Sequence, residues 1–297
     1  MPAPALAEGF PSWTEALTAL LPHRWTHTCY SHRLHRVELV FPGLPPGFDG
    51  VRILQLSDLH AGSMTHPEAL RPVMDAVRAL PTDLIVFTGD LVNAHEREFE
   101  PLADIMAGLT APLGVFSTLG NHDHGDDLKW DTQEAKTAHF ERLCGWHQTL
   151  GWTLLTNTHH LLHRGGDTLA LVGVDNWGAM PWVSKYADYA MAADGIPDTC
   201  FQILLSHHPD YWDYIVRKQF PQVSLTLSGH THGTQVGIEC GWVRISALKP
   251  FYPKWSGIYR AGHQVMYVNR GMGHSAHTTR IGIFPEITLL TLHRAQN

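Results

Sequence analysis

Short apolar runs alternate with amphipathic stretches through the first three quarters of the chain. Apolar, β-branched runs predict buried strands at residues 51–57, 84–88, 114–119, 169–174, 202–206 and 224–227. Apolar residues at helical spacing predict helices at 65–80, 99–109 and 140–150. Strands that alternate with helices of this length are typical of parallel βαβ units.

The two ends of the chain depart from this pattern. Residues 1–50 are interpreted as an N-terminal lead-in that closes with a turn-rich connector at 42–50. Within it, residues 12–21 predict a short amphipathic helix, which could pack on the body of the protein or dock on a membrane surface. The C-terminal segments predict antiparallel strands with little helix between them. We therefore expect one α/β domain with two packed sheets over residues 51–297.

Composition narrows the class of protein. The formal net charge is −7 and no basic stripe is present, which disfavours nonspecific nucleic-acid binding. No apolar run reaches the roughly 18 residues of a membrane-spanning helix, and the N-terminus lacks a secretion-signal pattern. We expect a cytoplasmic protein, with peripheral membrane contact as an alternative.

Reduced thiols fit better than a disulfide framework or a zinc ribbon, because the cysteines are far apart: Cys29, Cys144, Cys200 and Cys240.

A polar cluster directly follows each of five predicted strands. In an open α/β sheet, the loops beyond the carboxyl ends of the strands gather at one crevice, so these clusters are expected to converge. Residues two apart in an extended segment point to the same side. The clusters are Asp58-Leu59-His60, Gly89-Asp90, Gly120-Asn121-His122-Asp123, His207-His208 and Gly229-His230-Thr231-His232.

The chemistry of these clusters indicates a metal site. They offer carboxylate, imidazole and amide oxygen without thiolate, which suits manganese, iron, zinc or magnesium. Seven ligands are too many for one tetrahedral zinc and suit two cations about 3.5–4 Å apart with a shared carboxylate. A single D-x-H or G-D is often only a turn; all five clusters at strand ends favour function. The candidate ligands are Asp58, His60, Asp90, Asn121, His207, His230 and His232.

The order of these clusters resembles the motif set of the calcineurin-like metallophosphoesterase family. That set is D-x-H, G-D, G-N-H-D/E, a lone His and G-H-x-H, which here read SDLHAG, TGDLVN, GNHDHG, SHHPD and GHTHGTQ. The resemblance runs from about residue 51 to the C-terminus. The tail and the segment KWSGIY (254–259) look most like the bacterial YkuE/YaeI-like branch. The resemblance implies an α/β fold that is a four-layer sandwich of two mixed β-sheets flanked by helices.

The resemblance also implies a role for each residue. One metal would be held by Asp58, His60 and His232, and the other by Asn121, His207 and His230. Asp90 would bridge the two. His122 would lie unligated beside the substrate phosphate, with Asp123 orienting it. His207 is assigned as the ligand because it directly follows the strand, with its neighbour His208 as the alternative.

The expected activity is metal-dependent hydrolysis of phosphate esters by a hydroxide that bridges two divalent cations. Manganese is expected first, with iron, zinc or magnesium as alternatives. A phosphodiester or pyrophosphate is favoured over a monoester, and a lipid-linked substrate or a nucleotide are the two candidates. The preference for a diester rests on the aromatic stretch 176–186, which could line an apolar part of the pocket or meet a lipid surface. The alternative is that this stretch folds onto the core.

The sequence alone leaves other functions open. A non-catalytic binding scaffold on the same fold predicts missing ligands, and a mononuclear hydrolase of another bond predicts a single metal. Arg270 and Arg280 in the tail could pair with a second phosphate or an anionic headgroup, although lone arginines are more often solvated. His274 and His277 have the same open status.

Overall fold

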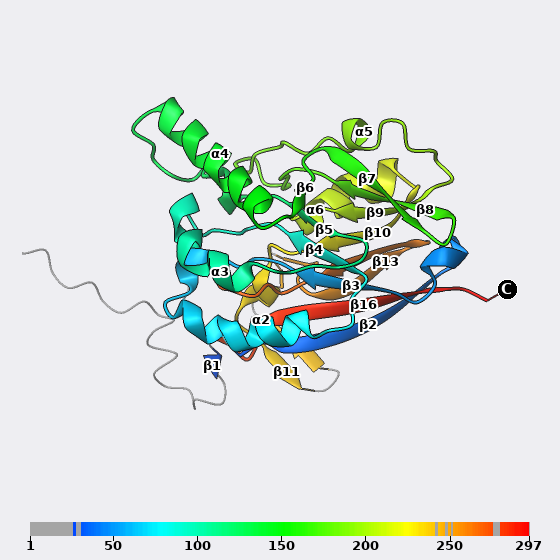
Figure 1. The fold of residues 1–297 in the computed structure, drawn as a ribbon, viewed down its shortest axis with the longest axis horizontal. Coiled ribbons are helices and arrows are strands. Elements are labelled where there is room, and N and C mark those ends of the chain that lie inside the picture. Colours follow the sequence, from blue (N-terminus) through cyan, green and yellow to red (C-terminus); the bar gives the residue numbers. More distant parts are fainter. Residues whose placement is uncertain are drawn as a thin grey trace, which may run out of the picture.

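The computed structural model describes residues 26–27, 31–240, 243–246, 249–250, 252–275 and 280–296. The amphipathic stretch expected at 12–21 lies outside these residues. Two six-stranded sheets dominate the described part and face each other (Figure 1). Among the described residues, no helix combines the length and the apolar character that crossing a bilayer requires.

The first sheet contains the three N-terminal strands of the βαβ pattern. Its strands β3, β4, β5 and β6 are parallel, while β16 runs antiparallel to β3 and parallel to β2. In spatial order the sheet consists of β2 (Arg33–Phe41), β16 (Glu286–Arg294), β3 (Val51–Leu56), β4 (Leu84–Thr88), β5 (Val115–Thr118) and β6 (Thr153–Leu154).

The second sheet has a parallel centre and antiparallel edges. Strands β8, β9, β10 and β14 are parallel, while β7 and β13 are antiparallel to their neighbours. Its order is β13 (Gly257–Ala261), β14 (Gln264–Val268), β10 (Val223–Ser228), β9 (Phe201–Leu205), β8 (Asp167–Gly173) and β7 (Thr158–Arg164). Two small pairs complete the strands: β1 (Thr26–His27) with β15 (Arg280–Ile281), and β11 (Ile238–Cys240) with β12 (Val243–Ile245).

Helices cover the outer face of each sheet. The first sheet is covered by η4 (Pro67–Leu70), α2 (Arg71–Arg78), η5 (Glu96–Leu102), α3 (Ala103–Met106) and α4 (Gln133–Thr149). The second is covered by α5 (Tyr189–Ala192), α6 (Pro209–Tyr211), the π-helical η7 (Trp212–Val216) and α7 (Arg217–Gln219). The remaining short turns are η2 (Pro46–Phe48), η3 (Ala61–Ser63), η6 (His122–His124) and η8 (His232–Thr234).

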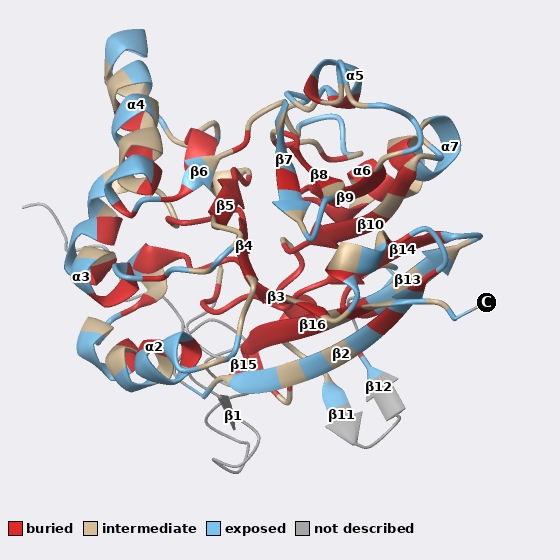
Figure 2. Cartoon of the chain, turned by 45° about the vertical axis from the view of Figure 1, so that its right-hand side comes forward, coloured by how far each residue is buried: buried red, intermediate tan, exposed pale blue. Residues whose placement is uncertain are grey.

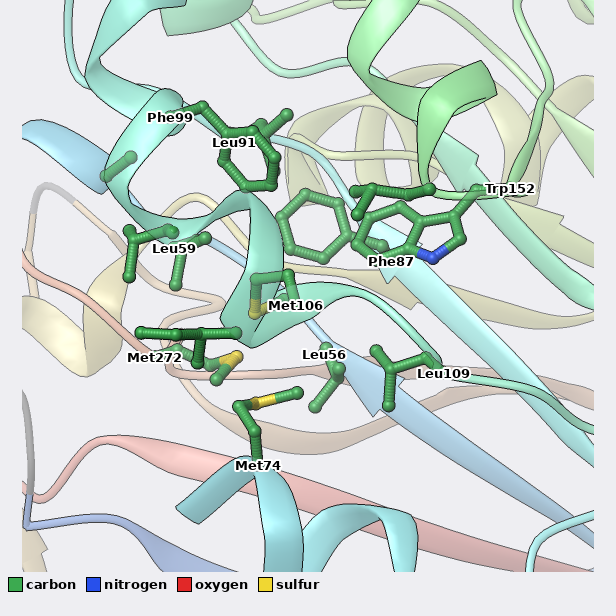
Figure 3. Close-up of a cluster of buried hydrophobic side chains, with 14 of the residues drawn as sticks. Leu56, Leu59, Met74, Phe87, Leu91, Phe99, Met106, Leu109, Trp152 and Met272 are labelled. Carbon is green, nitrogen blue, oxygen red and sulfur yellow. The ribbon is translucent and has the colours of Figure 1, made fainter. Parts of the chain in front are cut away.

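Central strands are buried on both faces, as parallel strands between helices and a second sheet must be. In β3 and β4, Ile53 and Val86 face the second sheet, whereas Leu54 and Phe87 face the helices. Figure 2 shows the sheets as largely buried and the outer helix surfaces as exposed. The cluster under the helices appears in Figure 3, with Met74 of α2 beside Met106 near the end of α3. The molecule is therefore a helix–sheet–sheet–helix sandwich, which confirms the expected fold class.

The structure also departs from the sequence-based expectations. The helix expected at 140–150 begins at Gln133, because the Thr132 side chain accepts a hydrogen bond from the Ala135 N–H at 3.1 Å and caps it. Strand β2 was not predicted and lies inside the expected lead-in. Its sequence has no continuous apolar run, because an edge strand buries few side chains. Only Leu39 and Phe41 of its nine residues are buried. The lead-in thus contributes a strand to the first sheet, while the boundary at residue 50 stays a prediction.

Candidate metal centre

The five polar clusters lie at the carboxyl ends of β3, β4 and β5 in one sheet and of β9 and β10 in the other. Backbone hydrogen bonds join the loops there. The Asp58 N–H donates to the Gly89 carbonyl at 2.9 Å, and the Gly229 N–H donates to the His207 carbonyl at 2.9 Å. The His230 N–H donates to Asp58 Oδ1 at 2.9 Å and so ties the two sheets together. All seven candidate ligands therefore meet at one end of the sandwich.

Five of these residues adopt a left-handed backbone conformation, in which a non-glycine residue is uncommon. Such conformations cluster at functional sites, where the surrounding structure holds the strain. The φ angles are 49° for Asp58, 46° for His60, 58° for Asp90, 72° for His230 and 51° for His232.

Two glycines allow the loops to approach each other this closely. A Cβ atom on Gly229 would overlap Ser57 Oγ and Asp58 Oδ2, and one on Gly120 would overlap Asp90 Oδ1. Both positions therefore require glycine for a steric reason.

The first ligand group contains Asp58, His60 and His232, and all three side chains are buried. The two imidazole Nε2 atoms lie 2.9 Å apart. His232 Nε2 lies 3.5 Å from Asp58 Oδ1, and His60 Nε2 lies 4.0 Å from it.

The second group contains Asn121, His207 and His230. His230 Nδ1 lies 2.9 Å from Asn121 Oδ1 and 3.2 Å from His207 Nε2. The His207 Nδ1–H donates to the Thr88 carbonyl at 2.8 Å, which leaves Nε2 directed into the group. The choice of His207 over His208 as the ligand stays a prediction.

Asp90 lies between the two groups. Its Oδ2 atom is 3.3 Å from His60 Nε2 in the first group and 3.0 Å from His207 Nε2 in the second. The carboxylate is 1% exposed, and these two separations are too short for a water molecule to lie between it and either imidazole.

The spacing of these atoms fits metal coordination. Bonds of about 2.0–2.1 Å from one cation to two ligand nitrogens place those nitrogens roughly 2.9–3.4 Å apart at octahedral to tetrahedral angles. The observed separations within the groups, 2.9 Å for His60–His232 and 3.2 Å for His207–His230, fall in this range. The donor set also matches the hard or borderline cations expected from the sequence.

Electrostatics at the site suit cation binding. Burial, with neighbouring imidazoles, holds the pKa of His230 and of His232 well below the usual value, so both keep a lone pair for coordination. Burial opposes protonation of His207, but Asp90 and Asp58 outweigh it and raise its pKa to about 9. A cation that binds His207 must therefore displace a proton.

His122 stands beside the first group, where one ligand atom each of His122, His60 and Asp90 lie within 4.8 Å of one another. Its ring centroid is 4.7 Å from that of His60, and its Nδ1–H donates to the Asn93 carbonyl at 2.6 Å. Nε2 is therefore the free nitrogen of this imidazole.

Asp123, expected to orient His122, makes other contacts: its carboxylate accepts hydrogen bonds from the N–H groups of Asp90, Leu91 and Gly120 at 2.8, 2.8 and 2.9 Å. In this structure a backbone carbonyl orients His122, and Asp123 holds the loops that carry Asp90 and Asn121.

The tail arginines are buried rather than solvated. Arg270 Nε donates to Ser256 Oγ at 2.9 Å and lies 3.2 Å from Glu286 Oε2. Arg280 donates to the His232 carbonyl at 3.0 Å and so supports a candidate ligand from behind. No sequence signal distinguished this arginine from a surface one. His274 is buried, and His277 lies outside the described residues.

Beyond the second group lies a cavity of about 550 Å³ that opens beside Asn121 and His230. The stretch 176–186 supplies Met180, Trp182 and Val183 to its wall. Trp182 is 76% exposed, whereas Trp177 packs against the core of the second sheet. This stretch therefore both folds onto the core and lines the cavity, two interpretations that the sequence had left as alternatives.

Comparisons with known proteins agree with this geometry. Residues 51–234 match the family model of the calcineurin-like phosphoesterases. The chain is 32% identical over 254 residues to the metallophosphoesterase YkuE of Bacillus subtilis, covering 84% of this chain and 81% of that protein. It is 28% identical over 282 residues to the UDP-2,3-diacylglucosamine pyrophosphatase LpxG of Chlamydia muridarum, covering 81% and 83%. It is also 28% identical over 270 residues to a transmembrane protein with a metallophosphoesterase domain from Danio rerio, covering 87% of this chain and 57% of that protein. On its motifs, its site geometry and these matches, the chain belongs to the calcineurin-like phosphoesterase family.

Proposed function

We propose that this protein hydrolyses phosphodiesters or pyrophosphates with two divalent cations. The single observation that carries the proposal is the position of Asp90, whose Oδ2 atom lies 3.3 and 3.0 Å from the nearest nitrogen of each ligand group. One shared carboxylate between two groups of three ligands is the arrangement a two-metal site requires. Asp58, His60 and His232 would hold one cation, and Asn121, His207 and His230 the other.

The bound cations, His122 and Asp123 would have different roles in the reaction. When bound, the cations would lower the pKa of a coordinated water to about 7 and so supply a nucleophile. His122 would transfer a proton at Nε2 to the leaving oxygen, since Nδ1 is held by the Asn93 carbonyl. Asp123 would hold the loops of Asp90 and Asn121 together through the four backbone N–H groups that donate to its carboxylate.

Two observations support a diester or pyrophosphate over a monoester. The cavity beside the second ligand group gives room for a second ester group, and it has apolar walls at Met180 and Trp182. The relative LpxG is named a pyrophosphatase of a lipid-linked nucleotide sugar. A lipid-linked substrate is one candidate, with a nucleotide as the other. The exposed Trp182 at the cavity rim would also suit peripheral contact with a lipid surface.

A substrate panel tests this function. The protein would be stripped with a chelator, reloaded with manganese, and assayed on p-nitrophenyl phosphate, bis(4-nitrophenyl) phosphate, cyclic nucleotides and UDP-diacylglucosamine. We expect metal-dependent hydrolysis of at least one diester or pyrophosphate, and no hydrolysis by Asp90→Asn. Hydrolysis of the monoester alone would remove the diester assignment. Two bound metals without hydrolysis of any ester would favour the binding scaffold instead.

A further inference from the structure

The cavity beside the metal ligands has an uneven distribution of charge. Its apolar side is formed by Met180, Trp182 and Val183. Its polar side carries three carboxylates, Asp126, Asp127 and Asp210. None of the described residues that line it is a lysine or an arginine.

The lysines nearest to this wall are engaged elsewhere. Lys136 Nζ pairs with Asp126 at 2.5 Å, so that carboxylate is neutralised. Lys185 Nζ donates to the Met180 carbonyl at 3.2 Å and to that of Gly178, and so closes the 178–185 loop on itself. Lys185 keeps its positive charge in these contacts, and that charge acts on Asp210. Asp127 is therefore the wall carboxylate for which the described residues give no lysine contact.

The imidazole in the wall adds no compensating cation. His208 stacks on His230 with ring centroids 3.9 Å apart. Its Nδ1 accepts a hydrogen bond from the Asp210 N–H at 3.2 Å, as a neutral imidazole does. The wall therefore presents carboxylate acceptors, one uncharged imidazole and an apolar surface.

The wall also has a defined shape before any ligand binds. Asp126 accepts hydrogen bonds from Ser184 Oγ and from Tyr186 OH, and Asp210 accepts one from the Ala179 N–H at 3.1 Å. The Asn176 carbonyl accepts from the Tyr186 N–H at 2.9 Å. Asp126 and Asp210 are thus held in place around the cavity.

Recognition of a phosphate or carboxylate group in proteins relies on arginine, lysine or free backbone N–H groups. In the part of the wall away from the two candidate cation sites, carboxylates without a lysine or arginine among the described lining residues disfavour an anionic group. This part of the wall suits an alcohol that is partly apolar and either uncharged or cationic, because an aromatic face beside a carboxylate also attracts an ammonium group.

We propose that this cavity is the subsite for one ester group of the substrate, an inference that rests on the proposed function. It selects an uncharged or cationic group with an apolar part and excludes a group that carries further negative charge. A pyrophosphate substrate would then have to place its second phosphate outside this cavity.

Symmetric diesters test the proposal, because the same group enters the cavity in either orientation. The manganese-loaded protein would be assayed on bis(4-nitrophenyl) phosphate and on bis(4-carboxyphenyl) phosphate. The readout is the ratio of the two kcat/KM values, compared between the wild type and Asp127 variants. Comparison between proteins cancels the difference in leaving-group chemistry. Asp127 is exposed, so its substitution leaves the core intact.

We expect Asp127→Asn to lower the preference for the uncharged diester by about fivefold and Asp127→Lys to lower it further, as a unit charge a few ångströms away in a watery site predicts. Asp104→Asn is the matched control, because it removes the same charge from an exposed residue of α3 outside the cavity. An unchanged ratio in both Asp127 variants, with both diesters hydrolysed, would overturn the subsite while leaving the proposed function intact. If the metal-loaded wild type hydrolyses neither these diesters nor any ester of the substrate panel, the proposed function fails and the subsite with it.

Discussion

Replacement of Asp123 by asparagine separates two roles for this residue. If the carboxylate holds the loops of Asp90 and Asn121, its loss should weaken folding and metal binding together. If it only orients His122, the loss should appear in kcat alone. The structure favours the first role, because the Asp123 carboxylate accepts hydrogen bonds from four backbone N–H groups. Those of Asp90, Leu91 and Gly120 lie within 2.9 Å and that of Val92 lies at 3.4 Å.

The size of the effect follows from these contacts. Oδ2 accepts from Asp90 and Gly120, while Oδ1 accepts from Leu91 at 2.8 Å and, more weakly, from Val92 at 3.4 Å. An asparagine has one acceptor oxygen, so in its better orientation the N–H groups of Leu91 and Val92 face the amide NH₂, and the short contact to Leu91 is lost. Such a loss destabilises a protein by about 1–3 kcal/mol. Part of it is offset, because burial and the nearby Asp90 raise the pKa of the Asp123 carboxyl, and the charge is unfavourable there.

Two measurements check this prediction. Thermal unfolding of the metal-free protein should show a midpoint lower by roughly 2–12 °C in Asp123→Asn, at about 2–4 °C per kcal/mol. Calorimetric titration with manganese should show affinity weaker by about 10–100-fold, as expected when a group that positions ligands is changed. Asp104→Asn is the control for loss of one carboxylate, since its side chain is 89% exposed. An unchanged midpoint with unchanged metal affinity would refute the loop-holding role.

Four further predictions follow from the same contacts. His122→Ala should lower kcat by about 10²–10⁴-fold with two metals still bound; loss of metal without loss of rate would contradict its role. Asp90→Asn should reduce metal content, measured by elemental analysis, from two ions per chain to at most one, and full activity with two ions would exclude a bridging carboxylate. Burial lowers the pKa of His147 to about 4 from 6.5, so below pH 6.5 the unfolded chain binds a proton that the folded chain does not. His147 should therefore contribute a fall of about 2 kcal/mol to the free energy of unfolding between pH 7 and pH 5. Urea denaturation at both pH values should show that His147→Gln makes the pH dependence smaller by this amount. Trp182→Ala should raise KM for bis(4-nitrophenyl) phosphate several-fold, because the indole ring lines the cavity. KM for small phosphate monoesters should stay nearly unchanged, because Trp182 belongs to neither ligand group.

Much of the central fold was readable from local patterns. Strands β3, β4, β5, β8, β9 and β10 coincide with apolar runs of the sequence, because a strand buried on both faces needs an unbroken apolar run. Edge strands carry no such signal. Strand β2 has an exposed face, and β7 mixes histidines with leucines in the sequence THHLLHR, so both were missed.

The candidate site was predictable in content but not in arrangement. Residue types and their places at strand ends sufficed to name seven candidate ligands, because coordination chemistry depends on the side chains themselves. The role of His122 came from the resemblance to the family, and all of these assignments stay predictions. The partner of Asp123 could not be predicted, since a carboxylate next to a histidine in sequence need not contact its ring. The role of Arg280 was equally hidden, because nothing in a lone arginine reveals that it will be buried behind His232.

The sequence by itself thus determined which chemical groups are present and which strands carry them, because both follow from local composition and periodicity. Only the tertiary structure decided how the groups combine. His230 and Asp58 are 172 positions apart, and they meet through the packing of one sheet on the other. That packing also forces five candidate ligands into left-handed backbone conformations and places three carboxylates on the cavity wall. Such features depend on long-range contacts, which no local pattern encodes.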